Sequence, residues 1–243
     1  MEKVLNLYKN KGETPLACIV RFKKAFPHYL SVPMTYAGRL DPLAEGVLVV
    51  LAGDEVANKD AYLNLPKEYE ATILMGVTTD TYDILGIPSE IRLLSKNHES
   101  LRTQIKKLEG TFASNYPPYS SKPVHGKPLF MWAREGRLHE IEIPTTTFSV
   151  TGVQVSKIIE VSGEKLLAQI KESLCLVMGD FRQEEILEAW KTKIIDSEKY
   201  TCVHVHFSVE SGTYIRTLAH MSGGTLLALV RTKVGEYKIE DAK

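Results

Sequence analysis

The stretch YAGRLDPLAEGVLVVL, at residues 36–51, constrains the fold more than any other part of the sequence. Pro42 pushes the residue before it, Asp41, out of the helical region, so the Asp41 carboxylate is displayed on an extended segment or turn. Residues 47–51 are all apolar and mostly β-branched, which predicts a buried strand immediately after this turn. An acid on a constrained turn that a rigid strand anchors is suited to catalysis, although Asp-Pro also opens turns without any chemical role.

Length and composition are those of an ordinary soluble globular protein. The 243 residues are enough for one large domain, and 25% of them are charged while 44% are apolar. No apolar run approaches the roughly 18 residues of a membrane helix, and the N-terminus lacks the apolar core of a signal peptide, so we expect no membrane contact and a cytoplasmic location. The formal net charge is zero, so an RNA-binding surface would have to be a local patch.

Metal and redox chemistry find little support in the sequence. The cysteines Cys18, Cys175 and Cys202 are widely spaced and form no CxxC pattern. His204 and His206 share a strand face without a third ligand, and the acids of residues 79–83 favour a solvated turn over a metal site. Neither a P-loop nor a GxGxxG fingerprint is visible, so no cofactor is expected.

Hydrophobic periodicity indicates an α+β chain. Helices are predicted at residues 14–26, 95–110 and 183–195. Strands are predicted at residues 67–76, 148–161, 165–170 and 200–209, with residues 162–164 as a hairpin turn. These elements predict a mixed, mostly antiparallel sheet flanked by helices.

Aromatic and basic residues are interleaved between residues 116 and 137. Rings stack on bases while cationic groups meet phosphates, so such a segment suits an RNA backbone with splayed bases. The alternative is a solvated loop with core aromatics. The aromatic members are Tyr116, Tyr119, Phe130 and Trp132, and the basic members are Lys122, His125, Lys127, Arg134 and Arg137.

Several of these segments resemble the TruB family of tRNA pseudouridine synthases. The family's Leu-Asp-Pro-Leu-Ala core stands at residues 40–44, its K-x-Y at 67–69 and its T-D-T-x-D at 79–83. Residues 116–136 resemble its segment beginning P-P-x-Y-S, residues 211–218 its S-x-G-T-Y-I-R-[ST]-L, and residues 226–235 its L-x-R-T-x-x-G. The sequence departs from the family at Tyr36, Arg39, Glu45, Thr78 and Pro123.

The resemblance implies a pseudouridine synthase fold and the isomerisation of uridine to pseudouridine in tRNA, most closely at the T-loop uridine. It assigns the catalytic acid to Asp41, the paired guanidinium to Arg216, and the stacking ring and candidate C5 base to Tyr69. Leu229 is the candidate for the leucine that presses on the flipped base, or else a core leucine. A shielded carboxylate keeps its charge only beside a fixed countercharge, which is the physical reason for the arginine. The residues carried over as RNA contacts are Tyr119, Lys122, His125, Lys127, Arg134, Leu229 and Arg231.

The target RNA and the domain plan stay open at this point. The expected partner is the T-arm of tRNA, bound by a monomer without a cofactor. Tyr36 and Arg39 keep another RNA such as rRNA as an alternative, and a non-catalytic RNA-binding or folding protein is a third possibility. Residues 1–243 are expected to form one catalytic domain without the family's C-terminal PUA module. Residues 172–198 are expected to be an acidic helical insertion that faces away from RNA or limits which RNA docks.

Overall fold

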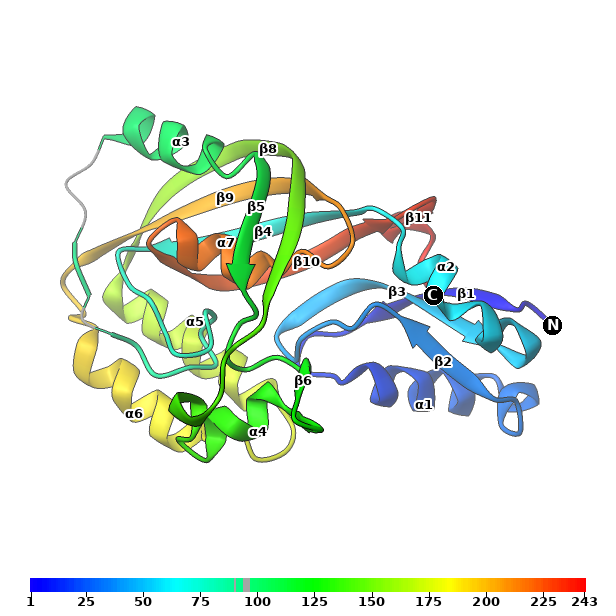
Figure 1. The fold of residues 1–243 in the computed structure, drawn as a ribbon. Coiled ribbons are helices and arrows are strands. Elements are labelled where there is room, and N and C mark those ends of the chain that lie inside the picture. Colours follow the sequence, from blue (N-terminus) through cyan, green and yellow to red (C-terminus); the bar gives the residue numbers. More distant parts are fainter. Residues whose placement is uncertain (90, 94–96) are drawn as a thin grey trace.

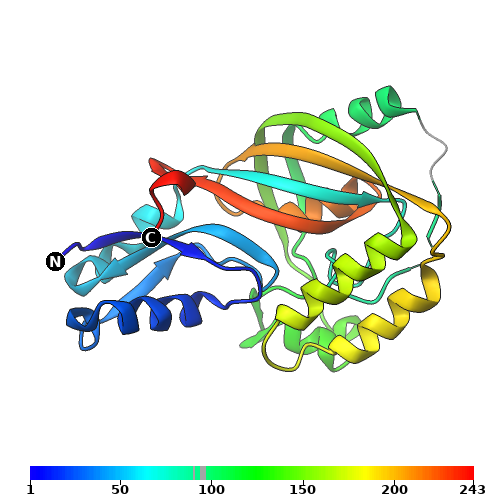
Figure 2. The same ribbon diagram turned by 180° about the vertical axis from the view of Figure 1, so that it is seen from behind.

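A nine-stranded sheet, formed by the residues that the computed structural model describes (1–89, 91–93 and 97–243), runs through the length of the molecule (Figures 1 and 2). Its order is β1-β3-β10-β4-β9-β8-β5, with β2 paired to β3 and β11 to β10. Strands β3 and β10 are parallel and the other neighbours antiparallel, so the predicted mixed, mostly antiparallel sheet is confirmed. The strands are β1 (Val4–Lys9), β2 (Met34–Ala37), β3 (Ala44–Ala52), β4 (Lys67–Met75), β5 (Gly110–Asn115), β8 (Thr145–Ser162), β9 (Lys199–Val209), β10 (Gly224–Val234) and β11 (Tyr237–Lys238).

Helices cover both faces of this sheet. Helix α1 lies beneath the β1–β3 end, and α5 and α6 lie side by side near the β8–β9 end (Figures 1 and 2). Within the described ranges, no helix is both long and apolar enough to cross a bilayer. The helices are α1 (Pro15–Ala25), α2 (Lys59–Leu63), α3 (His98–Lys106), α4 (Leu129–Arg134), α5 (Gly163–Leu176), α6 (Gln183–Lys193) and α7 (Ile215–Met221). Short 3-10 turns occupy Pro27–Tyr29, Gly53–Asn58, Leu138–Glu140 and Ile239–Asp241, and a small hairpin joins β6 (Pro123–Val124) to β7 (Lys127–Pro128).

The apolar run after Asp41 is a strand buried on both faces, as its sequence predicts. Leu48 and Val50 pack in a cluster with α1, while Val47, Val49 and Leu51 pack in a second cluster on the other side of β3. A strand covered on both faces reads as a continuous apolar run rather than an alternating one. The loop that precedes β3 and carries Asp41 is therefore held at one end by a rigid element.

The central strands separate two further hydrophobic clusters. Neighbouring residues of β4 point to opposite faces, so Ile73 packs against α3 and α7 while Leu74 packs against α5 and α6. Strand β9 alternates as predicted, with Val203, Val205 and Phe207 in the α3–α7 cluster. The two faces of the sheet are thus covered by different helix pairs.

Each of the three predicted helices corresponds to a helix of the structure. Helix α1 begins after its N-cap Thr14, and α6 falls within the predicted range 183–195. The helix predicted at 95–110 corresponds to α3, and positions 95 and 96 lie outside the described residues.

Residues 162–170 form no hairpin, contrary to the prediction. Strand β8 continues to Ser162, whose hydroxyl accepts a hydrogen bond from the Lys165 amide and caps α5. Leu166, Ile170 and Leu174 then recur at every fourth position on the buried face of that helix. The strand pairing ends at Ser162 opposite Lys199, so the helical segment between them spans residues 163–198, which we refer to as the excursion. It contains residues 172–198, the predicted insertion.

Candidate active site

The loop before β3 holds Asp41 at the edge of a cavity, with its side chain 33% exposed. Gly46 makes this placement possible because its φ is +103° and a Cβ atom there would lie 2.3 Å from the Arg231 carbonyl oxygen. A side chain at position 46 would therefore push β10 away from β3. The close approach of the two strands brings the Asp41 loop next to residues from the far end of the chain.

Two buried cations support this loop through its backbone. Arg231 is 1% exposed, and its Nε and Nη2 donate hydrogen bonds to the carbonyls of Val47 (2.8 Å) and Gly38 (3.0 Å). Lys9 donates to the Ala44 carbonyl at 2.6 Å, and burial lowers the pKa of its ammonium group to about 8. Arg231 is expected from the sequence to contact RNA; it lines the cavity and at the same time holds the loop through its Nε and Nη2.

Arg216, near the start of α7, faces Asp41 across the floor of the cavity. Its side chain is 4% exposed, its Nε lies 2.6 Å from Asp41 Oδ2, and its Nη1 donates to the Thr81 carbonyl at 2.8 Å. The structure thus brings together two side chains 175 positions apart in the sequence. Burial alone would lower the pKa of Arg216, but Asp41 and Asp83 outweigh it and the pKa is raised.

A second carboxylate, Asp83, lies near the same guanidinium. Its Oδ2 is 4.0 Å from Arg216 Nε, and its Oδ1 accepts hydrogen bonds from the Thr81 hydroxyl (2.7 Å) and the Leu85 amide (3.0 Å). Burial raises the pKa of Asp83 to about 6, Arg216 opposes this rise and Asp41 adds to it. The predicted solvated turn at 79–83 is therefore wrong, because Thr79, Thr81 and Asp83 are all buried.

In the part of the chain that the structure describes, metal ligands do not gather around these acids. Among the described residues, no three His, Cys, Asp or Glu side chains are grouped closely enough to hold a metal ion. On β9, His204 contacts the Thr72 hydroxyl and His206 lies 3.5 Å from a Glu68 carboxylate oxygen. Asp41 and Asp83 instead share one buried cation, which makes the site an ion-pair cluster.

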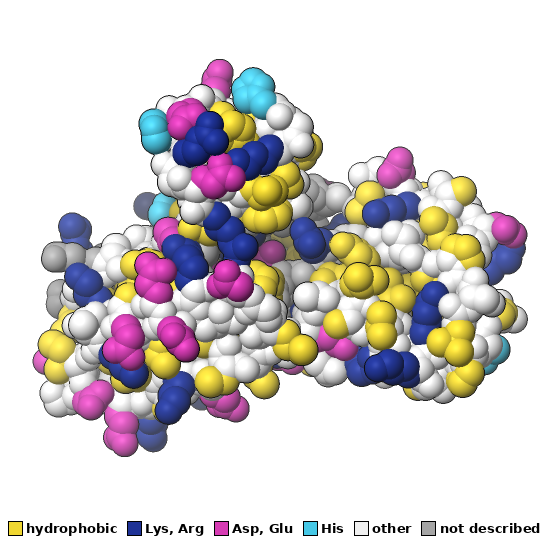
Figure 3. All heavy atoms as spheres, turned by 90° about the horizontal axis from the view of Figure 1, so that it is seen from below, with side chains coloured by type: hydrophobic (Ala, Val, Ile, Leu, Met, Phe, Trp, Pro, Cys, Tyr) yellow, Lys and Arg dark blue, Asp and Glu magenta, His cyan; other side chains and the backbone are white. Residues whose placement is uncertain are grey.

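Above the Asp41–Arg216 pair lies a cavity of about 600 Å³, which is within the usual range for small-molecule and nucleotide sites. Tyr69 on β4 and Leu229 on β10 form part of its wall and are 6% and 8% exposed. Figure 3 shows a hollow on the lower face of the molecule with Lys and Arg side chains around it. Seven of the ten residues given a catalytic or RNA-binding role from the sequence line the cavity: Asp41, Tyr69, Tyr119, Arg134, Arg216, Leu229 and Arg231.

The other three predicted RNA contacts lie outside the cavity lining, on the segment around β6 and β7. Lys122 lies over the Tyr116 ring at 5.1 Å, and Lys127 lies over the Trp132 ring at 4.5 Å while pairing with Glu135. His125 is exposed at the tip of the small hairpin. These aromatic rings carry cations on their faces, so the segment presents charge beside the cavity.

Sequence reasoning missed several residues that line the cavity. Asp180, Phe181 and Arg182 enter its wall from the loop between α5 and α6, within the excursion. Arg182 pairs with Asp80 at 2.8 Å, and nothing in the local sequence indicates a contact across 102 positions. Tyr214 could have been predicted, because it stands two residues before Arg216 in the segment that resembles the family's S-x-G-T-Y-I-R-[ST]-L.

The assembled site has the features needed to act on a nucleoside. A carboxylate faces the cavity, and a buried guanidinium that cannot lose its proton lies 2.6 Å from one of its oxygens. An aromatic ring and a leucine line the same cavity and offer apolar surface to a planar base.

Comparison with known proteins gives consistent matches. A family model described as TruB family pseudouridylate synthase (N terminal domain) matches residues 31–174. The tRNA pseudouridine synthase B of a Nostoc species is 30% identical over 251 residues, covering 100% of this chain and 70% of that protein. The protein of the same name from Syntrophus aciditrophicus is 33% identical over 186 residues, covering 68% of this chain and 58% of that protein.

Solved structures match the fold. A chain in the crystal structure of a Cbf5–Nop10–Gar1 complex gives a TM-score of 0.58 at 19% identity, covering 97% of this chain and 50% of that chain. A chain in an H/ACA RNP bound to a substrate RNA containing 2′-deoxyuridine gives 0.54 at 19% identity, covering 97% and 48%. The chain therefore spans about half the length of these structures.

These matches agree with the sequence motifs and with the place that each motif takes in the structure. The family model covers more than half of the chain, and the Nostoc relative aligns over all of it. The chain belongs to the TruB family of pseudouridylate synthases.

Proposed function

We propose that this protein isomerises uridine to pseudouridine in tRNA, at the uridine of the T-loop. The observation that carries the proposal is the contact of Asp41 with the buried Arg216 at a cavity of nucleotide size. A protein that only binds RNA has no need of a buried cation that holds one carboxylate toward a cavity. The names of the relatives, tRNA pseudouridine synthase B, support tRNA as the substrate.

The reaction breaks the N1–C1′ bond of uridine, turns the base over and joins C5 to C1′. A stacked base must first be flipped into the cavity, which costs a few kcal/mol. Stacking on Tyr69 and contact with Leu229 offset that cost. Asp41 acts on the sugar, as a nucleophile at C1′ or as a base at C2′, and Tyr69 accepts the proton that leaves C5.

Arg216 has a continuous role during these steps. Once RNA fills the cavity, the Asp41 carboxylate loses the water that its present 33% exposure provides. The Arg216 guanidinium stays in contact with it, with Nε 2.6 Å from Asp41 Oδ2, and replaces part of that lost solvation. The ion pair thus holds the carboxylate in place while it acts on the sugar.

RNA docks on the segment that borders the cavity. Tyr119 and Arg134 belong to the cavity wall, and Lys122, His125 and Lys127 extend the basic surface around β6 and β7. This arrangement supports a local basic patch on a chain of zero net charge. Within the same proposal, residues 1–243 act as one domain, as a monomer in the cytoplasm, and bind the T-arm without a cofactor.

Mapping the product tests the proposal. The protein is incubated with unmodified tRNA and rRNA transcripts, and pseudouridine is located by reverse transcription after carbodiimide treatment. We expect product at the T-loop uridine of tRNA. Product in rRNA alone would mean that the substrate is rRNA and not tRNA. Binding without product in either transcript would contradict the enzymatic function.

A further inference from the structure

The excursion, residues 163–198, is not needed to connect β8 to β9. The two strands remain paired up to Ser162 and Lys199, so a short turn could close the hairpin at that point. The chain instead makes two helices whose buried residues, among them Ile170 and Trp190, pack in the cluster that includes Leu85 of the cavity wall. Its position therefore calls for an explanation other than connectivity.

The excursion contacts two loops that carry the active site. Gly12 fits so closely against α5 that a Cβ there would lie 2.3 Å from the Leu176 carbonyl oxygen, and its amide donates to the Pro42 carbonyl beside Asp41. The indole of Trp190 donates to the Ile84 carbonyl at 3.3 Å, one residue after Asp83. The excursion thus supports both carboxylates that face Arg216.

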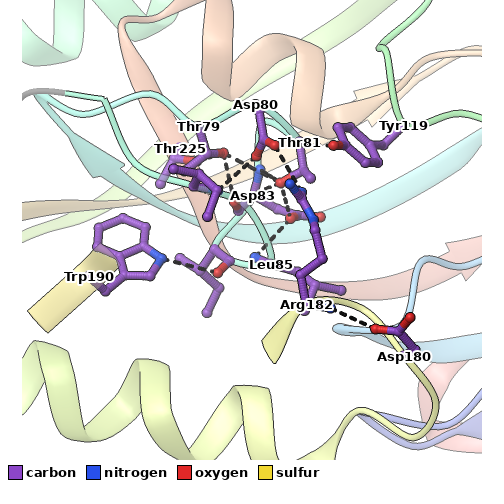
Figure 4. A network of polar contacts seen from close by, with 12 residues as sticks. Thr79, Asp80, Thr81, Asp83, Leu85, Tyr119, Asp180, Arg182, Trp190 and Thr225 are labelled. Carbon is purple, nitrogen blue, oxygen red and sulfur yellow. Dashed lines mark hydrogen bonds and ion pairs between the residues drawn. The ribbon is translucent and has the colours of Figure 1, made fainter. Parts of the chain in front are cut away.

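A third contact comes from residues 177–182, which join α5 to α6 and which we call the strap. Arg182 at its end has a left-handed backbone (φ +61°), and its Nη2 lies 2.8 Å from Asp80 Oδ2. The same guanidinium lies over the Tyr119 ring at 5.1 Å, and the Tyr119 hydroxyl donates to Asp80 Oδ2 at 3.2 Å. Figure 4 shows Arg182 reaching across to Asp80 next to Tyr119. All three belong to one network, and Tyr119 and Arg182 line the cavity.

Asp80 connects this network to the catalytic pair. Its Oδ1 accepts a hydrogen bond from the Ile87 amide at 2.7 Å, so the turn from Asp80 to Ile87 is held at both ends. The next residue, Thr81, presents its carbonyl oxygen to Arg216 Nη1 at 2.8 Å. A shift of Asp80 would therefore move an acceptor that orients the guanidinium facing Asp41.

We propose that Arg182 is a positioning residue for the isomerisation. Through Asp80 it fixes the Tyr119 ring in the cavity wall and the turn whose Thr81 carbonyl orients Arg216. This inference rests on the proposed function, because it assigns Arg182 a part in that reaction. It also gives the excursion a purpose, which is to bring a cation to the turn from outside the strands of the sheet.

The planar guanidinium matters as well as its charge. Arg182 combines an ion pair with a stack over a ring, and a lysine retains the first of these without the second. Arg182→Lys should therefore recover part of the effect of Arg182→Ala. If Arg182 served only to stabilise the fold, the two variants would instead differ in melting temperature while the folded protein turned over at the wild-type rate.

The test is a double-mutant cycle with steady-state kinetics on an unmodified tRNA transcript. Arg182→Ala, Asp80→Asn and the double variant are compared with wild type, with Arg182→Lys as the conservative variant and Lys191→Ala as the control. Lys191 belongs to the same excursion and forms an exposed ion pair with Glu188. Its substitution therefore removes one positive charge at a position that does not line the cavity. Circular dichroism and melting temperature establish that each variant is folded.

We expect kcat to fall about 10- to 100-fold in Arg182→Ala, since small misplacements of catalytic groups have effects of this size. KM should change by less than about threefold, Arg182→Lys should be intermediate, and the double variant should resemble the single variants because both act through one contact. Lys191→Ala should match wild type.

Wild-type kcat in Arg182→Ala, or in Arg182→Lys where the alanine variant fails to fold, would overturn the inference. Multiplicative losses in the double variant would also overturn it, because they would mean that Arg182 does not act through Asp80. If wild type is active, either of these two results leaves the proposed function intact. Inactive wild type would remove the proposed function and this inference together.

Discussion

Replacing Arg216 by methionine removes the buried cation that both site carboxylates face. The Arg216 side chain is 4% exposed, and the Asp83 side chain near its guanidinium is 11% exposed. Methionine fills much of the same space but offers no charge and no donor to the Thr81 carbonyl. The variant therefore leaves a buried carboxylate and a buried carbonyl without their partner.

Breaking a buried ion pair from one side costs about 3–5 kcal/mol, and Arg216→Met should lose stability in that range at pH 8. The loss should shrink at pH 5.5. Without Arg216 the folded-state pKa of Asp83 rises above its present value of about 6, so the native protein takes up a proton there and the buried charge disappears. Removing that charge by Asp83→Asn in the same chain should recover part of the loss at pH 8 without restoring turnover.

Urea unfolding of wild type, Arg216→Met and the double variant at both pH values measures these differences. Far-UV circular dichroism follows the transition, and m-values establish whether the unfolded states are comparable. If Arg216→Met remained within about 1 kcal/mol of wild type at pH 8, a loss typical of a surface ion pair, the reasoning on the buried cluster would be refuted.

Two further predictions concern the same loops. Gly46→Ala should lower the free energy of unfolding by about 2–4 kcal/mol, because the φ of Gly46 is +103° and the new Cβ would meet the Arg231 carbonyl oxygen. In urea titration it should be well below the control Gly53→Ala, whose new Cβ meets no neighbour. Asp83 has a pKa of about 6 in the native state against 3.8 for an unperturbed aspartate, so its contribution to stability is largest below pH 3.8 and is lost as pH rises through 6. As pH rises from 4.5 to 7.5, the stability of Asp83→Asn should therefore increase by about 2 kcal/mol relative to that of wild type. Parallel pH profiles for the two proteins would contradict this.

The helices and strands whose type depends on neighbouring residues could be predicted from the sequence. The apolar run of β3, the alternation of β9 and the Thr14-Pro15 start of α1 are each decided by neighbouring residues. The approach of Asp41 and Arg216 could be anticipated from the resemblance, since each stands in a distinctive motif.

The misses have tertiary causes. Residues 165–170 look like a strand until the cap at Ser162 and the apolar partners of α5 are known. The polar residues of 79–83 read as a surface turn, and they are buried because Arg216 and the Thr79–Thr225 hydroxyl contact compensate them. The role of Arg182 could not be predicted, because its contact with Asp80 depends on the path that the excursion takes in the folded chain.

Release of tritium from tRNA labelled at C5 of uridine tests the central claim most directly, because the C5 hydrogen leaves when C5 bonds to C1′. Wild type should release tritium in proportion to the T-loop uridine present. Asp41→Asn should release none while binding the same tRNA within a few-fold of wild type, since it keeps the size and most contacts of the side chain. Release by Asp41→Asn at a rate near that of wild type, or none by wild type itself, would contradict the assignment of Asp41 and Arg216 as the catalytic pair.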